Sequence, residues 1–332
     1  MLAGAAIALM NVLLPSLVKR RHPQRAGWLI GMYLLSLSAG AIVGSLIAVP
    51  VFNAAGGGAG SVRITLGLWA GPALIGAAVW LPQLRFRTQA GPETAADAGL
   101  GAGAAAARRS GAGRGSAGRG SAGRASAGWG GAARGGTAGL WRRALTWQVT
   151  AFMGLQSLSY YATLSWFPTV FRDRGLTAVH AGTLLAVMNL GNAVTALLVP
   201  VLAQRMRDQR LLAAVSMTVT GVGLAGAALG PLGAAGVFTF VLGLGQGASL
   251  GLGIFYTLAR APDPVTAASL SAFAQSVGYL LASAGPLLLG FLHTVTGGWT
   301  IPVWVLLGVI ALALVMGWLA GQARTVPGPS AG

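Results

Sequence analysis

The sequence predicts an all-α membrane protein, because its composition and the spacing of its apolar residues both fit membrane-spanning helices. Hydrophobic residues make up 55% of the 332 residues and charged residues only 8%, whereas about a quarter of the residues in soluble domains are charged. The apolar residues form runs of about 20 residues, the length that crosses roughly 30 Å of hydrocarbon as a helix. We expect nine transmembrane helices, at 2–18, 26–52, 62–81, 146–170, 179–203, 211–229, 234–259, 267–292 and 301–320.

The basic residues indicate which side of the membrane each connection faces. A net charge of +17 would suggest nucleic-acid binding in a soluble chain. Outside the long segment 84–144, however, nine Lys and Arg residues fall in one set of alternating connections, and only Arg63, Arg172 and Arg174 fall in the other. By the positive-inside rule the richer side is cytoplasmic, which places the long segment and the C-terminus in the cytoplasm and explains the charge without nucleic acid.

The segment 84–144 divides the chain into two apolar blocks. It consists almost wholly of Gly, Ala, Ser and Arg, and a five-residue unit begins at Arg114, Arg119 and Arg124. Such a composition buries too little apolar surface to offset the entropy of ordering, so we expect a flexible cytoplasmic loop. The predicted domains are a partial bundle of three helices over 1–83, the loop over 84–144, a bundle of six helices over 145–322 and a cytoplasmic tail over 323–332.

The candidate binding residues are uncharged, since no Asp, Glu, Lys or Arg lies in the middle of any predicted helix. Amides and phenols instead recur at helical spacing, so that neighbouring polar residues share one face. An unpaired amide in hydrocarbon costs several kcal/mol, so these faces should point at a partner helix or a watery cavity. The predicted solute-binding residues are Asn11, Gln156, Tyr160, Asn189, Asn192, Gln246, Gln275 and Tyr279.

A purely structural role is the alternative for each of these residues, because Asn and Gln in membrane helices often bond a neighbouring helix and do nothing else. Gly243, Gly247 and Gly251 recur at four-residue spacing, which favours close helix packing. No Lys follows them as in a phosphate-binding loop, which argues against a nucleotide site.

Four stretches resemble one known family. They are GAAIALMNVLLPSLVKR at 4–20, MGLQS at 153–157, GLGQG at 243–247, and LSAFAQSVGYLLASAGP at 270–286 followed by TGGW at 296–299. They resemble helices four, seven, ten and eleven of the cyanate permease and 2-nitroimidazole transporter family of the major facilitator superfamily. This resemblance implies a major facilitator-type helical bundle, in which two bundles rock around a solute site near the membrane midplane.

Members of that superfamily usually have twelve spans, with the longest cytoplasmic loop between helices six and seven. Nine spans, three of them before the long loop, match this pattern without helices one to three. We therefore expect either that the coding sequence extends upstream of Met1 or that the product is an incomplete protein that does not transport.

The sequence favours a transporter over an enzyme. The chain has no cysteine, which excludes disulfides and a thiol nucleophile, and it has no membrane-facing cluster of His, Asp and Glu suited to metal binding or acid-base work. With the resemblance, we expect a monomeric permease in the bacterial inner membrane that moves a cyanate-like anion or a small heteroaromatic, with no metal, cofactor or nucleic acid. The alternatives are a non-transporting fragment and a membrane scaffold that acts through the basic loop.

Overall fold

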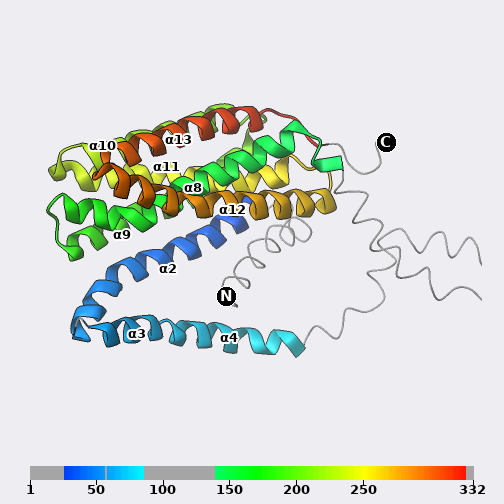
Figure 1. Cartoon of the computed structure of the whole chain (residues 1–332). Coiled ribbons are helices and arrows are strands. Elements are labelled where there is room, and N and C mark those ends of the chain that lie inside the picture. Colours follow the sequence, from blue (N-terminus) through cyan, green and yellow to red (C-terminus); the bar gives the residue numbers. More distant parts are fainter. Residues whose placement is uncertain (1–25, 57, 86–138, 327–332) are drawn as a thin grey trace, which may run out of the picture. The chain divides into compact units, whose positions relative to one another are not determined.

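The computed structural model describes residues 26–56, 58–85 and 139–326, and all the regular structure in these ranges is helical (Figure 1). Six long helices, α8 to α13, belong to one compact unit, whereas α3, α4 and the end of α2 belong to another. The helices are α2 (Ala26–Ala54), α3 (Ala59–Gly67), α4 (Ala70–Arg85), α8 (Ala144–Asp173), α9 (Ala178–Arg205), α10 (Arg210–Leu229), the 3₁₀ turn η4 (Leu232–Ala234), α11 (Ala235–Ala259), α12 (Pro264–Thr296) and α13 (Thr300–Ala320).

The predicted helices of the second block are confirmed. Each of the six segments predicted between 146 and 320 forms one long helix, and the segment predicted at 26–52 corresponds to α2. The first predicted helix, 2–18, lies outside the described residues, as does most of the predicted loop.

The prediction of one helix over 62–81 was wrong, because α3 and α4 are separate helices on either side of Leu68 and Trp69. Pro72 has no N–H to bond the carbonyl of Leu68, four residues earlier, and its ring would clash with that carbonyl in a continuous helix. The chain resumes helical bonding at Ala73, whose N–H donates to the Trp69 carbonyl at 3.3 Å. Neither helix alone reaches across roughly 30 Å of hydrocarbon at 1.5 Å per residue.

Five helices in the described ranges are long and apolar enough to cross a membrane: α9, α10, α11 with its preceding 3₁₀ turn, α12 and α13. Helix α8 is long enough, with 30 residues, but polar side chains such as Gln148, Gln156 and Tyr160 make it less apolar than these five. The total of nine transmembrane helices therefore stays a prediction.

The six long helices form one bundle in which α11 packs against both α9 and α10, while α8 packs against α12 and α13 (Figure 1). Helices α8 and α11 also contact each other, α8 contacts α9, and α11 contacts α12, whereas α10 and α13 contact each other and pack on α11 and α8. The largest buried side chains include Phe152 of α8 and Tyr256 of α11, whose ring centroids are 5.6 Å apart. The bundle thus has one group of four helices and a supporting pair.

Glycines set the closest approach between α9 and α11. A Cβ atom at Gly243 would collide with the Met188 carbonyl, and one at Gly247 would collide with the Asn192 carbonyl. At Gly251 the added atom would lie 3.0 Å from the ring of a proline on α9. Small residues allow such backbone contact, so the predicted packing role of these three glycines is confirmed.

A second glycine contact places α12 beside α8. A Cβ atom at Gly154 would lie 3.1 Å from the Cα atom of Gly278, and one at Gly278 would lie 3.2 Å from the Gly154 nitrogen. Gly278 follows Gln275 and precedes Tyr279 along α12, so this crossing fixes where two of the predicted binding residues sit in the bundle.

Helix α12 is capped at both ends. The Asp263 carboxylate accepts hydrogen bonds from the backbone N–H groups of Val265 and Thr266, both at 2.9 Å, and Pro264 occupies the first helical position. At the other end Gly297 adopts the left-handed conformation, with φ of 68°, which glycine tolerates without strain.

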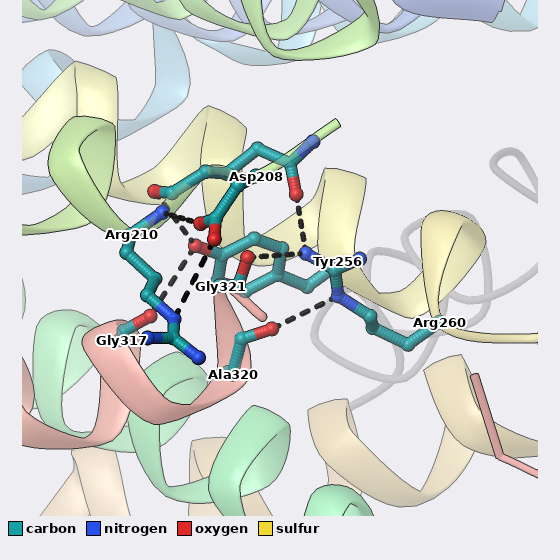
Figure 2. A network of polar contacts seen from close by, with 8 residues as sticks. Asp208, Arg210, Tyr256, Arg260, Gly317, Ala320 and Gly321 are labelled. Atoms are coloured by element: carbon teal, nitrogen blue, oxygen red, sulfur yellow. Dashed lines mark hydrogen bonds and ion pairs between the residues drawn. The ribbon is translucent and has the colours of Figure 1, made fainter. Parts of the chain in front are cut away.

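Arg260 joins three parts of the bundle at the end predicted to be cytoplasmic (Figure 2). Its side chain, 4% exposed, donates through Nε to the Ala320 carbonyl at 2.9 Å and through Nη2 to the Gly321 carbonyl at 3.0 Å and to Gln209 Oε1. Burial lowers the pKa of Arg260 from its ordinary value, and the nearby Tyr256 and Asp208 act in the opposite direction. The network ties the α9–α10 turn and the end of α11 to the end of α13.

Candidate functional site

The predicted binding residues that the structure describes all lie on the helices α8, α9, α11 and α12. Gln156 and Tyr160 are on α8, Asn189 and Asn192 on α9, Gln246 on α11, and Gln275 and Tyr279 on α12. The five amides are at most 3% exposed, and the two tyrosines are half-buried. These five amides are thus buried within the protein, whereas Asn11 lies outside the described residues.

One hydrogen bond joins two of the predicted residues across helices. The Tyr160 hydroxyl of α8 donates to Asn189 Oδ1 of α9 at 3.2 Å. The other end of the same amide is held by its own helix, because Asn189 Nδ2 donates to the Leu185 carbonyl at 3.0 Å. Asn189 therefore presents its oxygen to α8 in a fixed orientation.

A second bond joins α11 to α8. Gln246 Nε2 donates to Thr163 Oγ1 at 3.4 Å, and the Thr163 hydroxyl donates to the Ser159 carbonyl at 2.7 Å. Ser159 and Thr163 were missed by the sequence prediction, although positions 156, 159, 160 and 163 follow the i, i+3, i+4, i+7 spacing of one helical face. This spacing indicates that Ser159 and Thr163 share a face with Gln156 and Tyr160. Small hydroxyl residues are common in membrane helices, however, so their presence alone does not indicate a binding site.

Gln156 and Gln275 bond within their own helices, and Tyr279 packs against apolar groups. Gln156 Nε2 donates to Ser157 Oγ at 2.7 Å, and Gln275 Nε2 donates to Ser271 Oγ at 2.8 Å, as expected for residues four apart. Tyr279 packs against a cluster that includes Met153 of α8 and residues of α9 and α11. These contacts fit a structural role as well as a binding role.

Two buried oxygens of this region have no hydrogen-bond partner among the described residues. They are Gln246 Oε1 and Ser159 Oγ, on side chains that are each 2% exposed. Buried polar atoms in folded proteins are nearly always paired with protein or with water. The unpaired Gln246 amide oxygen and Ser159 hydroxyl are therefore the two atoms of this region that still lack a hydrogen-bond partner within the described residues.

The cluster, which we call the α8–α9–α11 polar cluster, consists of Ser159, Tyr160, Thr163, Asn189 and Gln246, all uncharged. The acidic residues of the described ranges stand at helix ends or in turns: Asp173, Asp208 and Asp263. Within these ranges no group of three His, Cys, Asp or Glu side chains is arranged to hold a metal ion. The cluster can recognise a solute by hydrogen bonds and shape, but it holds no acid or base for covalent chemistry.

Another group of polar contacts lies at the end of α8, at the α12–α13 turn. The Trp299 indole donates to Asp173 Oδ2 at 2.8 Å and stacks on His293, with ring centroids 4.0 Å apart. His293 Nε2 lies 4.0 Å from the same carboxylate oxygen. These contacts link the end of α8 to the α12–α13 turn, outside the polar cluster.

Comparison with known proteins places this geometry in a family. No family model matches the chain. The chain is 35% identical over 326 residues to a 2-nitroimidazole transporter of Escherichia coli (strain K12), covering 97% of this chain and 72% of that protein. It is 31% identical over 326 residues to an uncharacterized transporter of Bacillus subtilis (strain 168), covering 98% and 71%. It is also 24% identical over 302 residues to a cyanate transport protein of Escherichia coli (strain K12), covering 90% and 66%.

The chain is therefore a multi-pass membrane protein of a transporter class, and not an enzyme. It belongs to the cyanate permease family of the major facilitator superfamily. The resemblance read from the sequence is confirmed.

Proposed function

We propose that this chain is a secondary transporter that carries a small uncharged heteroaromatic solute across the bacterial inner membrane by alternating access. The observation that carries this proposal is the α8–α9–α11 polar cluster, where hydrogen-bonding side chains from three helices meet in the bundle without a charge. Relatives that transport 2-nitroimidazole and cyanate support a small solute.

Within the described residues no Lys or Arg belongs to the polar cluster, which favours a neutral solute over an anion. The basic residues of α8 to α13 stand near helix ends, as Arg172, Arg205 and Arg210 do. Moving an anion into a low-dielectric interior is costly unless a cation or several donors meet it. Tyr160 and Thr163 already use their hydroxyl protons inside the protein, which leaves few donors for an anion.

The second candidate is a cyanate-like anion, which the similarity to a cyanate transport protein favours. An anion would need donors from the part of the chain before α8 as well. Asn11, a predicted binding residue in the first apolar segment, is the candidate for that contribution.

In the proposed mechanism the six-helix bundle moves as one body against the bundle formed by the first apolar segments. The glycine contacts between α9 and α11 and the Arg260 network hold the six helices together, as such movement requires. The segment 84–144 serves as a flexible cytoplasmic connection between the bundles, and the protein works as a monomer without a cofactor.

Solute flux into liposomes that contain the purified protein, together with any residues encoded upstream of Met1, tests the proposal. We expect saturable uptake of labelled 2-nitroimidazole that decreases when unlabelled solute is added in excess. Uptake of cyanate that follows the potential would favour the second candidate. Uptake of neither solute above that of empty liposomes would count against both.

A further inference from the structure

Gln246 of α11 and Ser159 of α8 each carry a buried polar atom that no described group bonds. Both side chains are 2% exposed, and within the described ranges neither Gln246 Oε1 nor Ser159 Oγ has a hydrogen-bond partner. The two residues are connected through Thr163, which accepts from Gln246 Nε2 at 3.4 Å and donates to the Ser159 carbonyl at 2.7 Å. The bonded chain thus runs from the Gln246 amide nitrogen through Thr163 to the Ser159 backbone, while Gln246 Oε1 and Ser159 Oγ stay outside it.

The orientation of the Gln246 amide follows from Thr163. A threonine hydroxyl has one proton, and the 2.7 Å bond to the Ser159 carbonyl uses it. The oxygen of Thr163 can then only accept from Gln246, so the amide nitrogen must face Thr163. This leaves Oε1 as the free end of the side chain, and an amide oxygen can only accept hydrogen bonds.

We propose that Gln246 Oε1 accepts a hydrogen bond from an N–H or O–H group of the solute, and that Ser159 Oγ bonds the solute beside it. This inference rests on the proposed function and adds the residue that selects the solute. The site selects solutes that have a hydrogen-bond donor, such as an azole with a free ring N–H. An analogue without the donor leaves the buried oxygen unpaired, which is why such a site discriminates strongly.

The unpaired atoms distinguish Gln246 from the other buried amides of the bundle. Asn189 is bonded at both ends of its amide, and Gln275 is bonded to Ser271. Of these three side chains, Gln246 is the one with a buried oxygen that the described protein leaves unpaired. A water molecule is the competing partner, and it would not distinguish one solute from another.

Binding of matched azoles to the purified full chain in lipid nanodiscs tests this inference. The probes are 1-methyl-2-nitroimidazole, in which the methyl group replaces the N–H, and 4-methyl-2-nitroimidazole, which has the same size and keeps it. We expect the N–H compound to bind the wild-type protein about 10-fold more tightly or better, the effect of about one lost hydrogen bond.

The variant Gln246→Met has a side chain of similar length without the acceptor. In it we expect the ratio of the two affinities to fall close to one, while the N-methyl compound still binds. The matched control is Ser216→Ala on α10, a buried serine that bonds the Leu212 carbonyl of its own helix, and it should keep the wild-type ratio.

Equal affinity of the wild-type protein for the two compounds would overturn the inference while leaving the proposed function intact. This comparison needs no variant, so it stands even if Gln246→Met does not fold. An unchanged ratio in a folded Gln246→Met protein would overturn it as well and would favour a bound water. If neither azole binds the wild-type protein, the proposed function fails and the inference fails with it.

Discussion

The close contact between α9 and α11 allows a quantitative prediction for Gly243. The helices can approach this closely because glycine has no Cβ atom. In Gly243→Ala the new Cβ atom would collide with the Met188 carbonyl oxygen and would lie 2.8 Å from its carbon and 3.1 Å from the Asn192 nitrogen. All three are backbone atoms, which cannot turn aside as the end of a flexible side chain can. The two helices must therefore move apart.

The size of the effect follows from two opposing terms. Overpacking a tight contact costs about 3 kcal/mol or somewhat more, and alanine regains about 1 kcal/mol over glycine inside a helix. We expect a net loss of about 2 kcal/mol, which lowers the melting temperature of a bundle of this size by about 4–8 °C.

The assay is thermal unfolding followed by the fluorescence of the tryptophans, ten in the chain. The matched control is Gly308→Ala in α13, an exposed position where an added Cβ atom would meet nothing within 4 Å. The control should be as stable as the wild type or slightly more stable. If Gly243→Ala melted at the same temperature as Gly308→Ala, the close approach of α9 and α11 would be wrong.

Three further predictions address the other parts of the molecule. Arg260→Gln should lower stability by about 2–4 kcal/mol, because buried carbonyls lose charge-assisted partners, whereas the same change at the exposed Arg207 should have little effect in the same thermal assay. Gln275→Leu and Tyr279→Phe should each reduce transport at unchanged membrane level, by about 1–3 kcal/mol for a lost bond to a desolvated solute; wild-type flux in both variants would remove them from the site. Deletion of residues 111–136 should leave insertion and transport intact, since the remaining segment still joins the two bundles, and a loss of flux in an inserted protein would reveal a specific role for the loop.

Hydrophobic run length predicted the long helices well, because a membrane helix must satisfy its own backbone and needs about 20 apolar residues to do so. The exception is the segment 62–81, where local chemistry overrides run length: Pro72 interrupts the hydrogen bonding between α3 and α4. Proline at that position was visible in the sequence. Its effect depends on the turn before it, which the apolar pattern does not encode.

The candidate site was predictable as a list of residues but not as a set of contacts. Helical spacing correctly placed the amides on buried faces, because an unpaired amide avoids lipid. It gave no indication that Tyr160 bonds Asn189 or that Gln246 reaches Thr163, since such pairs depend on how helices cross. Arg260 shows the same limit, because a basic residue at a helix end is ordinarily solvated, and only the fold brings acceptors from the α9–α10 turn and the end of α13 around it.

The central claim, that solute is carried through the polar interior of the six-helix bundle, is tested most directly by counterflow. Liposomes loaded with unlabelled 2-nitroimidazole are diluted into the labelled compound, and wild-type protein is compared with Asn189→Leu and with the control Ser216→Ala. The account predicts saturable accumulation of label with the wild type and the control, and a decrease of at least about 10-fold with Asn189→Leu, which removes the partner of Tyr160. Equal accumulation by all three proteins would contradict the placement of the site. The account as a whole would be contradicted if the wild-type protein neither transported nor bound a small solute but did bind a soluble partner through its basic loop.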